Sequence, residues 1–250
     1  MPMQRKLEIS CFSAESAFLA EQAGAHRIEL CDNYFEGGTT PSYGTIKTVM
    51  EKLKIPVNVI LRPRGGDFLY SSREFAGIID DLKLVKDLGV NGVVVGFLKP
   101  NGEIDEKRIG RFVRIAHPIE VTFHRAFDMC KDPHEALEEL VEAGVKRILT
   151  SGTRNTALDG AEMLLSFQKQ ARERIVIMPG AGINADNLKA LIQKTVAFEF
   201  HSSAKTFQNS AMEFYSFGVS MNGEEHDEYR KITVDTNQIQ KMLEILQKTN

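Results

Sequence analysis

Tryptophan is absent from this sequence of 250 residues, and cysteine occurs only three times, as Cys11, Cys31 and Cys130. Three scattered cysteines are too few for a disulfide framework, which excludes a small disulfide-stabilised secreted fold. No stretch approaches the roughly 20 apolar residues of a membrane-spanning helix, and the N-terminus lacks the apolar core of a signal peptide. The sequence therefore predicts a reduced, cytoplasmic protein with no membrane partner.

An excess of one charge is also missing. The chain carries 31 Lys and Arg against 34 Asp and Glu, a formal net charge of −3. It has no long basic run and no interleaving of arginines with aromatic residues, so nucleic acid is not an expected partner. The hydrophobic fraction of 42% is enough for a sizeable core, which excludes disorder, collagen-like repeats and a coiled coil.

Short β-branched segments recur along the chain, and each ends in polar or glycine-rich residues. They are Leu7–Cys11, Arg27–Cys31, Val57–Leu61, Gly92–Gly96, Glu120–His124, Arg147–Ser151, Ile175–Met178 and Ala197–His201. Helical patterns separate them, with capping-box spacing at Ser71 and Glu74 and at Asp132 and Glu135, and with Pro133 in a first helical position. Eight such units without a break in composition predict an α/β fold, a single-domain (β/α)8 TIM barrel over residues 1–250. A doubly wound open sheet is the alternative.

One segment interrupts the regular spacing of the units. A long loop at about residues 202–235 separates the eighth strand from the last predicted helix. Connections of this length in a compact domain are usually functional or interfacial. We therefore expect a partner subunit or a lid at this loop.

Polar residues on the predicted strands alternate in a way that indicates which of them face the barrel interior. The predicted interior positions are Glu8 and Ser10, Glu29 and Cys31, Asn58, Ile60 and Arg62, Thr122 and His124, Ile148 and Thr150, and Glu199 and His201. Burying this much charge is costly unless the groups are paired or bound to something. The set is consistent with a salt-bridge network or with a site that acts on a ligand.

Two loops add candidate catalytic residues at the strand ends, where barrel enzymes place their chemistry. Arg62 and Arg64 precede Asp67 in a loop rich in glycine and proline, and guanidinium groups suit a carboxylate or a phosphate. His124 precedes Asp128, and a histidine near a carboxylate suits acid–base catalysis or metal binding. The candidate catalytic residues are Glu8, Glu29, Arg62, Asp67, His124, Asp128 and His201.

Glycines and serines follow the last two strands, at Gly180, Gly182, Ser202 and Ser203. Many barrels bind phosphate through backbone N–H groups at these loops. Together with Arg64 they form the predicted anion-binding set, although tight turns alone would also explain the glycines. A metal site drawn from Glu8, Glu29, His124, His201 and Cys31 is a further alternative, for zinc, manganese, iron or copper(I).

Several of these motifs resemble those of the CutC family. They are Glu8-Ile9, Arg27–Cys31, Glu36–Ser42, Arg62–Phe68, Val121–Asp128, Leu149–Gly152, Gly180–Gly182, His201–Ala204 and Asp227–Tyr229. The resemblance implies a TIM barrel with a cytoplasmic role in copper homeostasis, and copper(I) binding through cysteines near the ends of the first two strands. It maps the metal site onto Cys31, with Ser10 at the matching first-strand position and Cys11 beside it. It also implies a homodimer or a larger homo-oligomer.

Two functions follow from these observations. The first is the copper-binding homeostasis protein that the resemblance implies. The second is a barrel enzyme with isomerase, lyase or hydrolase chemistry on a small anionic or phosphorylated metabolite. In the second, Glu8, Glu29 or His124 would move protons, while Arg62, Arg64 and the glycine and serine loops would hold the anion.

Overall fold

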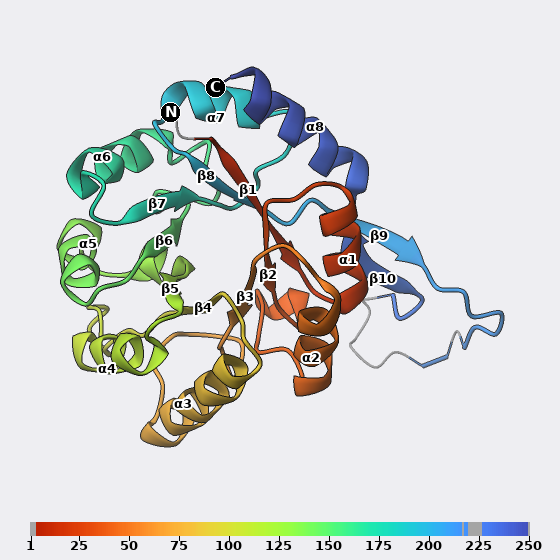
Figure 1. The fold of residues 1–250 in the computed structure, drawn as a ribbon, viewed down its shortest axis with the longest axis horizontal. Helices are drawn as coiled ribbons and strands as arrows, with labels where there is room; N and C mark the ends of the chain where they lie inside the picture. Colours follow the sequence, from red (N-terminus) through yellow and green to blue (C-terminus); the bar gives the residue numbers. More distant parts are fainter. Residues whose placement is uncertain (1–3, 217, 220–226, 250) are drawn as a thin grey trace.

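Eight parallel strands form the centre of the computed structural model, which describes residues 4–216, 218–219 and 227–249 (Figure 1). The strands are β1 (Lys6–Cys11), β2 (Arg27–Leu30), β3 (Val57–Ile60), β4 (Gly92–Val95), β5 (Glu120–Phe123), β6 (Arg147–Thr150), β7 (Val176–Pro179) and β8 (Glu199–Ser202). The helices are α1 (Ala14–Gln22), α2 (Tyr43–Lys52), α3 (Ser72–Asp87), α4 (Glu106–Ala116), α5 (Pro133–Glu142), α6 (Ala161–Ala171), α7 (Leu188–Lys194) and α8 (Thr236–Lys248). Short 3₁₀ helices follow β2 (η1, Tyr34–Glu36) and β5 (η2, Arg125–Met129).

The strand order closes the sheet into a barrel. Hydrogen-bonded neighbours run in sequence order from β7 back to β1, and β1 then pairs with β8. In Figure 1 the strands form a ring, β7 lies next to β8, and the helices surround it. The predicted single-domain (β/α)8 barrel is therefore confirmed, and the open sheet is excluded.

Two helix starts that the sequence predicts are present. The Ser71 hydroxyl accepts from the backbone N–H of Glu74 and the Glu74 carboxylate accepts from that of Ser71, which completes a capping box before α3. The Asp132 carboxylate accepts from the N–H of Glu135, and Pro133 begins α5. Such caps fix where each helix begins, and hence the loop that leads to it.

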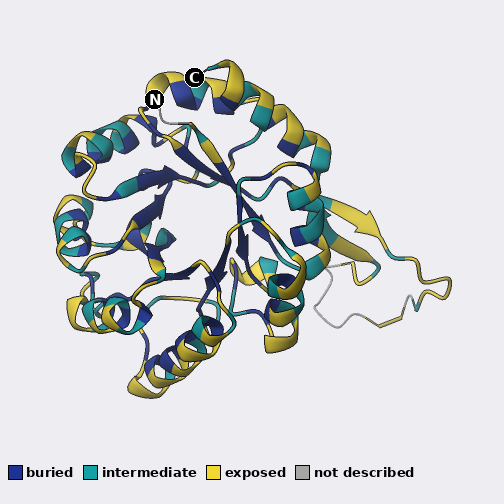
Figure 2. Ribbon diagram, in the orientation of Figure 1, coloured by how far each residue is buried: buried dark blue, intermediate teal, exposed yellow. Residues whose placement is uncertain are grey.

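Alternate residues of each barrel strand face the helices or the interior, and Figure 2 shows the barrel strands mostly in the colour of buried residues. On β1, Leu7 and Ile9 belong to the apolar layer under the helices, whereas Glu8 faces inward. On β6 the prediction that Ile148 and Thr150 face inward is wrong. Ile148 is part of the apolar layer, and Arg147 points inward because Glu199 on β8 binds its guanidinium.

The segment predicted as a long loop contains an antiparallel ribbon of two strands, β9 (Lys205–Asn209) and β10 (Arg230–Val234). Figure 1 shows the ribbon projecting from the barrel beside α1. The residues that flank the ribbon are hydrogen-bonded to each other, because the Asp235 N–H donates to the Ala204 carbonyl at 2.7 Å. Positions 217 and 220–226 of the predicted loop lie outside the described residues.

None of the helices among the described residues has both the length and the apolar character needed to cross a bilayer.

Candidate functional site

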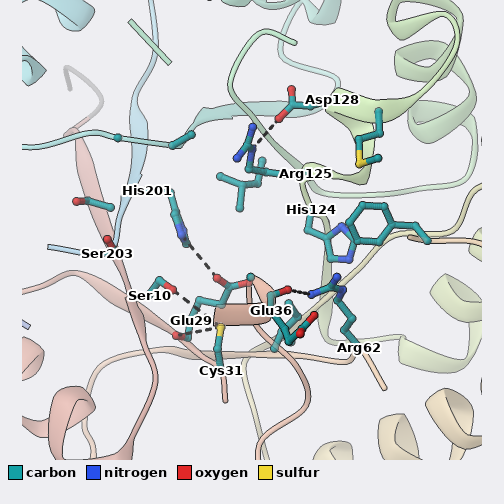
Figure 3. Close-up of a pocket in the computed structure, with 18 residues that line it drawn as sticks. Ser10, Glu29, Cys31, Glu36, Arg62, His124, Arg125, Asp128, His201 and Ser203 are labelled. Carbon is teal, nitrogen blue, oxygen red and sulfur yellow. Dashed lines mark hydrogen bonds and ion pairs between the residues drawn. The ribbon is translucent and has the colours of Figure 1, made fainter. Parts of the chain in front are cut away.

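A cavity of about 370 Å³ opens at the C-terminal ends of the strands (Figure 3). Its wall includes these predicted site residues: Glu29, Cys31, Arg62, His124, Asp128, Gly182, His201, Ser202 and Ser203. Other residues complete it, among them Ser10, Glu36, Phe68, Arg125, Leu149 and Ala181. The strand ends thus bring together residues that lie far apart in the sequence, at the place where barrel enzymes carry their active sites.

Glu8 lies just below the cavity and is 2% exposed. One carboxylate oxygen accepts hydrogen bonds from the Arg27 guanidinium and from Asn58 Nδ2 at 3.0 Å, and the other lies 2.8 Å from His201 Nδ1. Burial raises the pKa of Glu8, but the charges of Arg27 and His201 outweigh burial and hold it well below its usual range. Glu8 is therefore ionised and orients His201.

A second layer of charge lies deeper in the barrel. Glu199 Oε2 accepts from Arg27 Nη2 at 2.7 Å and from Arg147 Nε at 2.6 Å. Neither arginine belongs to the predicted site. Arg27 lies two residues before Glu29 on β2 and therefore on the same face of the strand, so the alternation of side chains could have placed it inside. Arg147 is likewise the first residue of β6. The pairing removes the main cost of burying these charges.

Glu29 and His201 meet at the cavity wall, where His201 Nε2 lies 3.6 Å from Glu29 Oε2. Burial raises the pKa of Glu29 to about 7, because the charge of Glu8 adds to burial and His201 only partly opposes them. Burial lowers the pKa of His201, but the hydrogen bond with Glu8 and the charge of Glu29 raise it overall. A carboxyl group with a pKa of about 7 and an imidazole with a raised pKa thus lie side by side at the cavity wall.

His124 lies on another part of the wall and is 5% exposed. Its Nδ1 accepts a hydrogen bond from the Ala126 N–H at 3.1 Å, so the proton of the neutral ring is on Nε2. Nε2 is buried and has no hydrogen-bond partner in the described chain. Burial and the charge of Arg62 lower the pKa of His124 to about 3, so the ring is neutral.

Arg62 beside His124 secures the loops of the cavity. Its guanidinium donates to the carbonyls of Glu36 at 2.5 Å, Gly38 at 2.8 Å and Gly66 at 2.8 Å. Its Nε is buried without a partner among the described residues, and the guanidinium lies over the Phe68 ring. Arg62 therefore brings positive charge to the cavity while it holds two loops in place.

Asp128 is surrounded by donors from the loop after β6. It accepts from the Thr150 hydroxyl at 2.5 Å, from the N–H groups of Ser151 and Thr153 at 3.1 Å, and from Arg125 Nε at 2.8 Å. These contacts occupy both oxygens, so the geometry makes Asp128 an organiser of the loop. Arg125 lies outside the predicted site, yet its half-exposed guanidinium reaches the cavity rim.

Besides Glu8 and Cys11, three predicted residues are absent from the described cavity wall: Arg64, Asp67 and Gly180. Arg64 pairs with Glu74 at 2.6 Å and with Asp67 at 3.0 Å, and both members of the Arg64–Asp67 pair are exposed. Gly180 lies behind the wall, where a Cβ atom would come within 2.4 Å of Leu149 Cδ1. Gly180 thus provides space, and Arg64 and Asp67 belong to the outer surface.

The cysteines of the implied copper site lie on opposite sides of the strand layer. Cys31 lines the cavity with Sγ at 4.0 Å from Ser10 Oγ, whereas Cys11 belongs to the apolar layer under the helices. Burial raises the pKa of both thiols above the ordinary value, which disfavours the thiolate that a metal needs. Within the described residues no three His, Cys, Asp or Glu side chains converge on a metal position. The donors do not fit a two-thiolate copper(I) site.

The fold and the site together define a (β/α)8 barrel with a polar cavity at the C-terminal ends of its strands. Some polar atoms of the wall residues have no hydrogen-bond partner among the described residues. Barrel enzymes carry their active sites at this end of the barrel. The CutC family model matches residues 5–206, and the chain belongs to the CutC family. A CutC family protein of Chromobacterium violaceum is 42% identical over 246 residues, which cover 98% of this chain and 100% of that protein.

Solved structures agree with this assignment. The CutC protein of Streptococcus agalactiae, described as a candidate copper homeostasis protein, is 31% identical with a TM-score of 0.75, covering 80% of this chain and 98% of that one. Phosphoribosylanthranilate isomerase from Thermotoga maritima is 14% identical with a TM-score of 0.58, covering 98% and 99%. The second likeness shows the barrel fold alone.

Proposed function

We propose that this protein is an enzyme that moves a proton within a small anionic metabolite bound at the barrel mouth. The observation that carries the proposal is the Glu29–His201 pair on the cavity wall, with 3.6 Å between its nearest charged atoms. A general base works best when its pKa lies near the operating pH, and the pKa of Glu29 is about 7. Glu8 and Arg27 hold this pair from below, so the base is also fixed in place.

An anionic group of the substrate would bind beside His201, at the loops that follow β7 and β8. Ala181 and Gly182 have positive φ values of 81° and 71°, which turns the loop after β7 tightly at the cavity. The N–H groups of Gly182 and Ser203 donate no hydrogen bond to the described part of the chain. Arg125, which follows β5, adds positive charge to the wall of the same cavity. Free N–H groups beside a guanidinium suit a phosphate or a carboxylate.

The test is a panel of phosphorylated and carboxylated metabolites, screened by thermal shift and then followed by NMR for product formation. Arg125→Gln should weaken binding by on the order of tenfold, whereas Arg174→Gln, in an exposed pair with Glu138, is the matched control and should bind normally. Glu29→Gln should retain binding and lose turnover by at least about 100-fold. The proposal fails if no anionic compound binds, or if Glu29→Gln turns substrate over normally.

Copper(I) binding is the second candidate, because the relative from Streptococcus agalactiae is described as a copper homeostasis protein and Cys31 faces the cavity. It would depend on a single thiol. Competition with a copper(I) chelator measures the affinity of the wild type, of Cys31→Ala and of Cys11→Ala. A direct role predicts tight binding that Cys31→Ala abolishes and Cys11→Ala retains. Equal affinities in all three would remove Cys31 from consideration.

We also propose that the protein works in the cytoplasm as a homodimer or larger homo-oligomer. The segment that joins β9 to β10 exposes apolar side chains, with Met212 at 56% and Phe214 at 74% exposure, and Phe207 on β9 is 42% exposed. Such side chains favour a subunit contact. Sedimentation of the wild type and of Phe214→Ser gives the test, and a wild type that stays monomeric at high concentration would contradict it.

A further inference from the structure

The Nε2–H of His124 is a fixed hydrogen-bond donor that the described protein leaves without an acceptor. The Ala126 N–H fixes the tautomer from one side. Gly96 makes room for the ring in this position, because a Cβ atom at residue 96 would lie 2.3 Å from His124 Cε1. Buried donors are nearly always paired in folded proteins, and His124 is one of the residues that line the cavity, so a ligand there is the available source of an acceptor.

The neighbours of His124 define what this acceptor is. The ring is neutral and lies 4.8 Å from Phe68, and the positive charge of Arg62 lies beside it. A neutral imidazole is a weak acid, so it polarises an oxygen without protonating it outright. Barrel isomerases use a neutral histidine in this way, as an electrophile on a carbonyl oxygen, together with a glutamate base.

The glutamate base is present in the same cavity. Figure 3 shows Glu29 with His201 on one side, and His124 with Arg62 on another. The cavity of about 370 Å³ admits a small metabolite that would touch both sides at once. None of the described residues that line it is a lysine, so a Schiff base has no nucleophile there.

Building on the proposed function, we propose that the substrate is a phosphorylated aldose or ketose, and that the protein catalyses its enolisation. The Glu29 carboxylate removes a proton from the carbon next to the carbonyl group. The electron pair of that C–H bond forms a C=C bond and displaces the carbonyl π pair onto oxygen. The resulting enediolate oxygen accepts hydrogen bonds from His124 Nε2–H and from Arg62.

Return of the proton completes the reaction without any co-reactant. Glu29 gives its proton to the neighbouring carbon, and the hydroxyl proton passes directly from one enediolate oxygen to the other while His124 Nε2–H donates to them. An aldose thereby becomes a ketose, with no oxidant, reductant or added group, and both residues end as they began.

The experiment is proton exchange in D₂O, followed by NMR, with triose, tetrose, pentose and hexose monophosphates as probes. Polyol phosphates of the same size, which lack the carbonyl group, are the matched control compounds. We expect one sugar phosphate to lose the signal of the C–H next to its carbonyl, and the polyol phosphates to bind without exchange. His124→Gln should lower kcat on the order of 100-fold with little change in KM.

Two further variants separate a chemical role of His124 from a structural one. Gly96→Ala touches no substrate but displaces the ring, so it should lower kcat and leave KM unchanged. His134→Gln changes an exposed histidine that contacts Gln170, and its exchange rate should match that of the wild type.

A measurement on the unaltered protein guards against variants that fail to fold. A phosphorylated hydroxamate that mimics the enediolate should bind at least about 100-fold more tightly than the matching carboxylate. Equal affinities, or sugar phosphates that bind without exchange, would overturn the enolisation and leave the proposed anion site intact. If no anionic compound binds at all, the proposed function falls together with it.

Discussion

His201 and His124 both lie on the wall of one cavity, but their neighbours carry opposite charges. Glu8 and Glu29 flank His201 and raise its pKa, although burial alone would lower it. Arg62 and aromatic rings surround His124, and burial with the arginine lowers its pKa to about 3. The barrel thereby keeps one imidazole ready to hold a proton and the other neutral.

The difference shows how strand order assigns chemical roles. β8 and β1 are adjacent, so His201 lies beside the Glu8 carboxylate, with Glu29 on the next strand. His124 follows β5 on the other side of the ring, near the arginine that follows β3. Groups of the same type take different charge states because the sheet surrounds each with different strands.

Of the variants considered, Glu8→Gln should have the largest effect, because it removes the carboxylate that distinguishes the surroundings of His201 from those of His124. It leaves Arg27 without a charged partner at one side and removes the carboxylate that orients His201. Loss of one member of a buried ion pair costs about 3–5 kcal/mol of unfolding free energy. Urea denaturation measures this loss, and NMR titration should show the pKa of His201 falling. Glu244→Gln, in an exposed pair with Lys248, is the control and should change stability by less than about 0.5 kcal/mol.

The second largest effect should be on the pH dependence of stability, which reports the charge state of Glu29 beside His201. In the folded chain Glu29 keeps its proton up to about pH 7, whereas the unfolded chain releases it near 4.5. The folded state holds the extra proton in this window, so the Glu29 contribution to the free energy of unfolding falls as pH rises from 4.5 to 7. Glu29→Gln should therefore be more stable than the wild type by about 3 kcal/mol above this window and equal to it below. Denaturation at both ends tests it, and an equal difference at both would contradict the raised pKa.

Gly96→Ala acts on the other histidine with a smaller effect. The new methyl group displaces the His124 ring, and overpacking of this kind costs about 1–2 kcal/mol. Nitrogen chemical shifts of the ring should then report a mixture of tautomers instead of one Nε2–H form. Gly77→Ala on α3 has open space around the added methyl and serves as the control. An unchanged ring spectrum would show that Gly96 does not position His124.

Arg64→Gln should have the smallest effect. Arg64 is bound to Glu74 and Asp67 at the surface, and exposed pairs contribute about 0–1 kcal/mol. We expect the pKa of His124 and the affinity for anionic compounds to stay unchanged, because Arg62 supplies the charge at the cavity. Tighter or weaker anion binding in this variant would return Arg64 to the site.

Local signals in the sequence were enough to predict the fold. The β-branched runs mark the strands to within a residue or two, and the caps at Ser71 and Asp132 begin helices where expected. The inward face of β6 could not be predicted in the same way. Arg147 at a strand start resembles a surface residue until its partner Glu199, on β8, is known.

In the site, too, local sequence patterns predicted some positions, and others depended on contacts with distant strands. Strand parity brought Glu29 and His201 to the cavity, because their positions depend on the strands alone. The loop after β3 was harder: Gly66 has a φ of 77°, and the chain turns there so that Arg62 faces the cavity and Arg64 faces solvent. The charge states of His124 and His201 depend on neighbours from other strands, which no local pattern contains.

The ribbon of β9 and β10 leaves and re-enters the barrel at nearly one point, since the Asp235 N–H bonds to the Ala204 carbonyl. Val234 at the base of β10 belongs to the buried core, so the barrel depends on the base of the ribbon and not on its length. A shorter or longer connection at the far end of the ribbon would preserve the eight units, because closure entropy grows slowly with length. An appendage of variable length can thus project beside the cavity rim without altering the barrel.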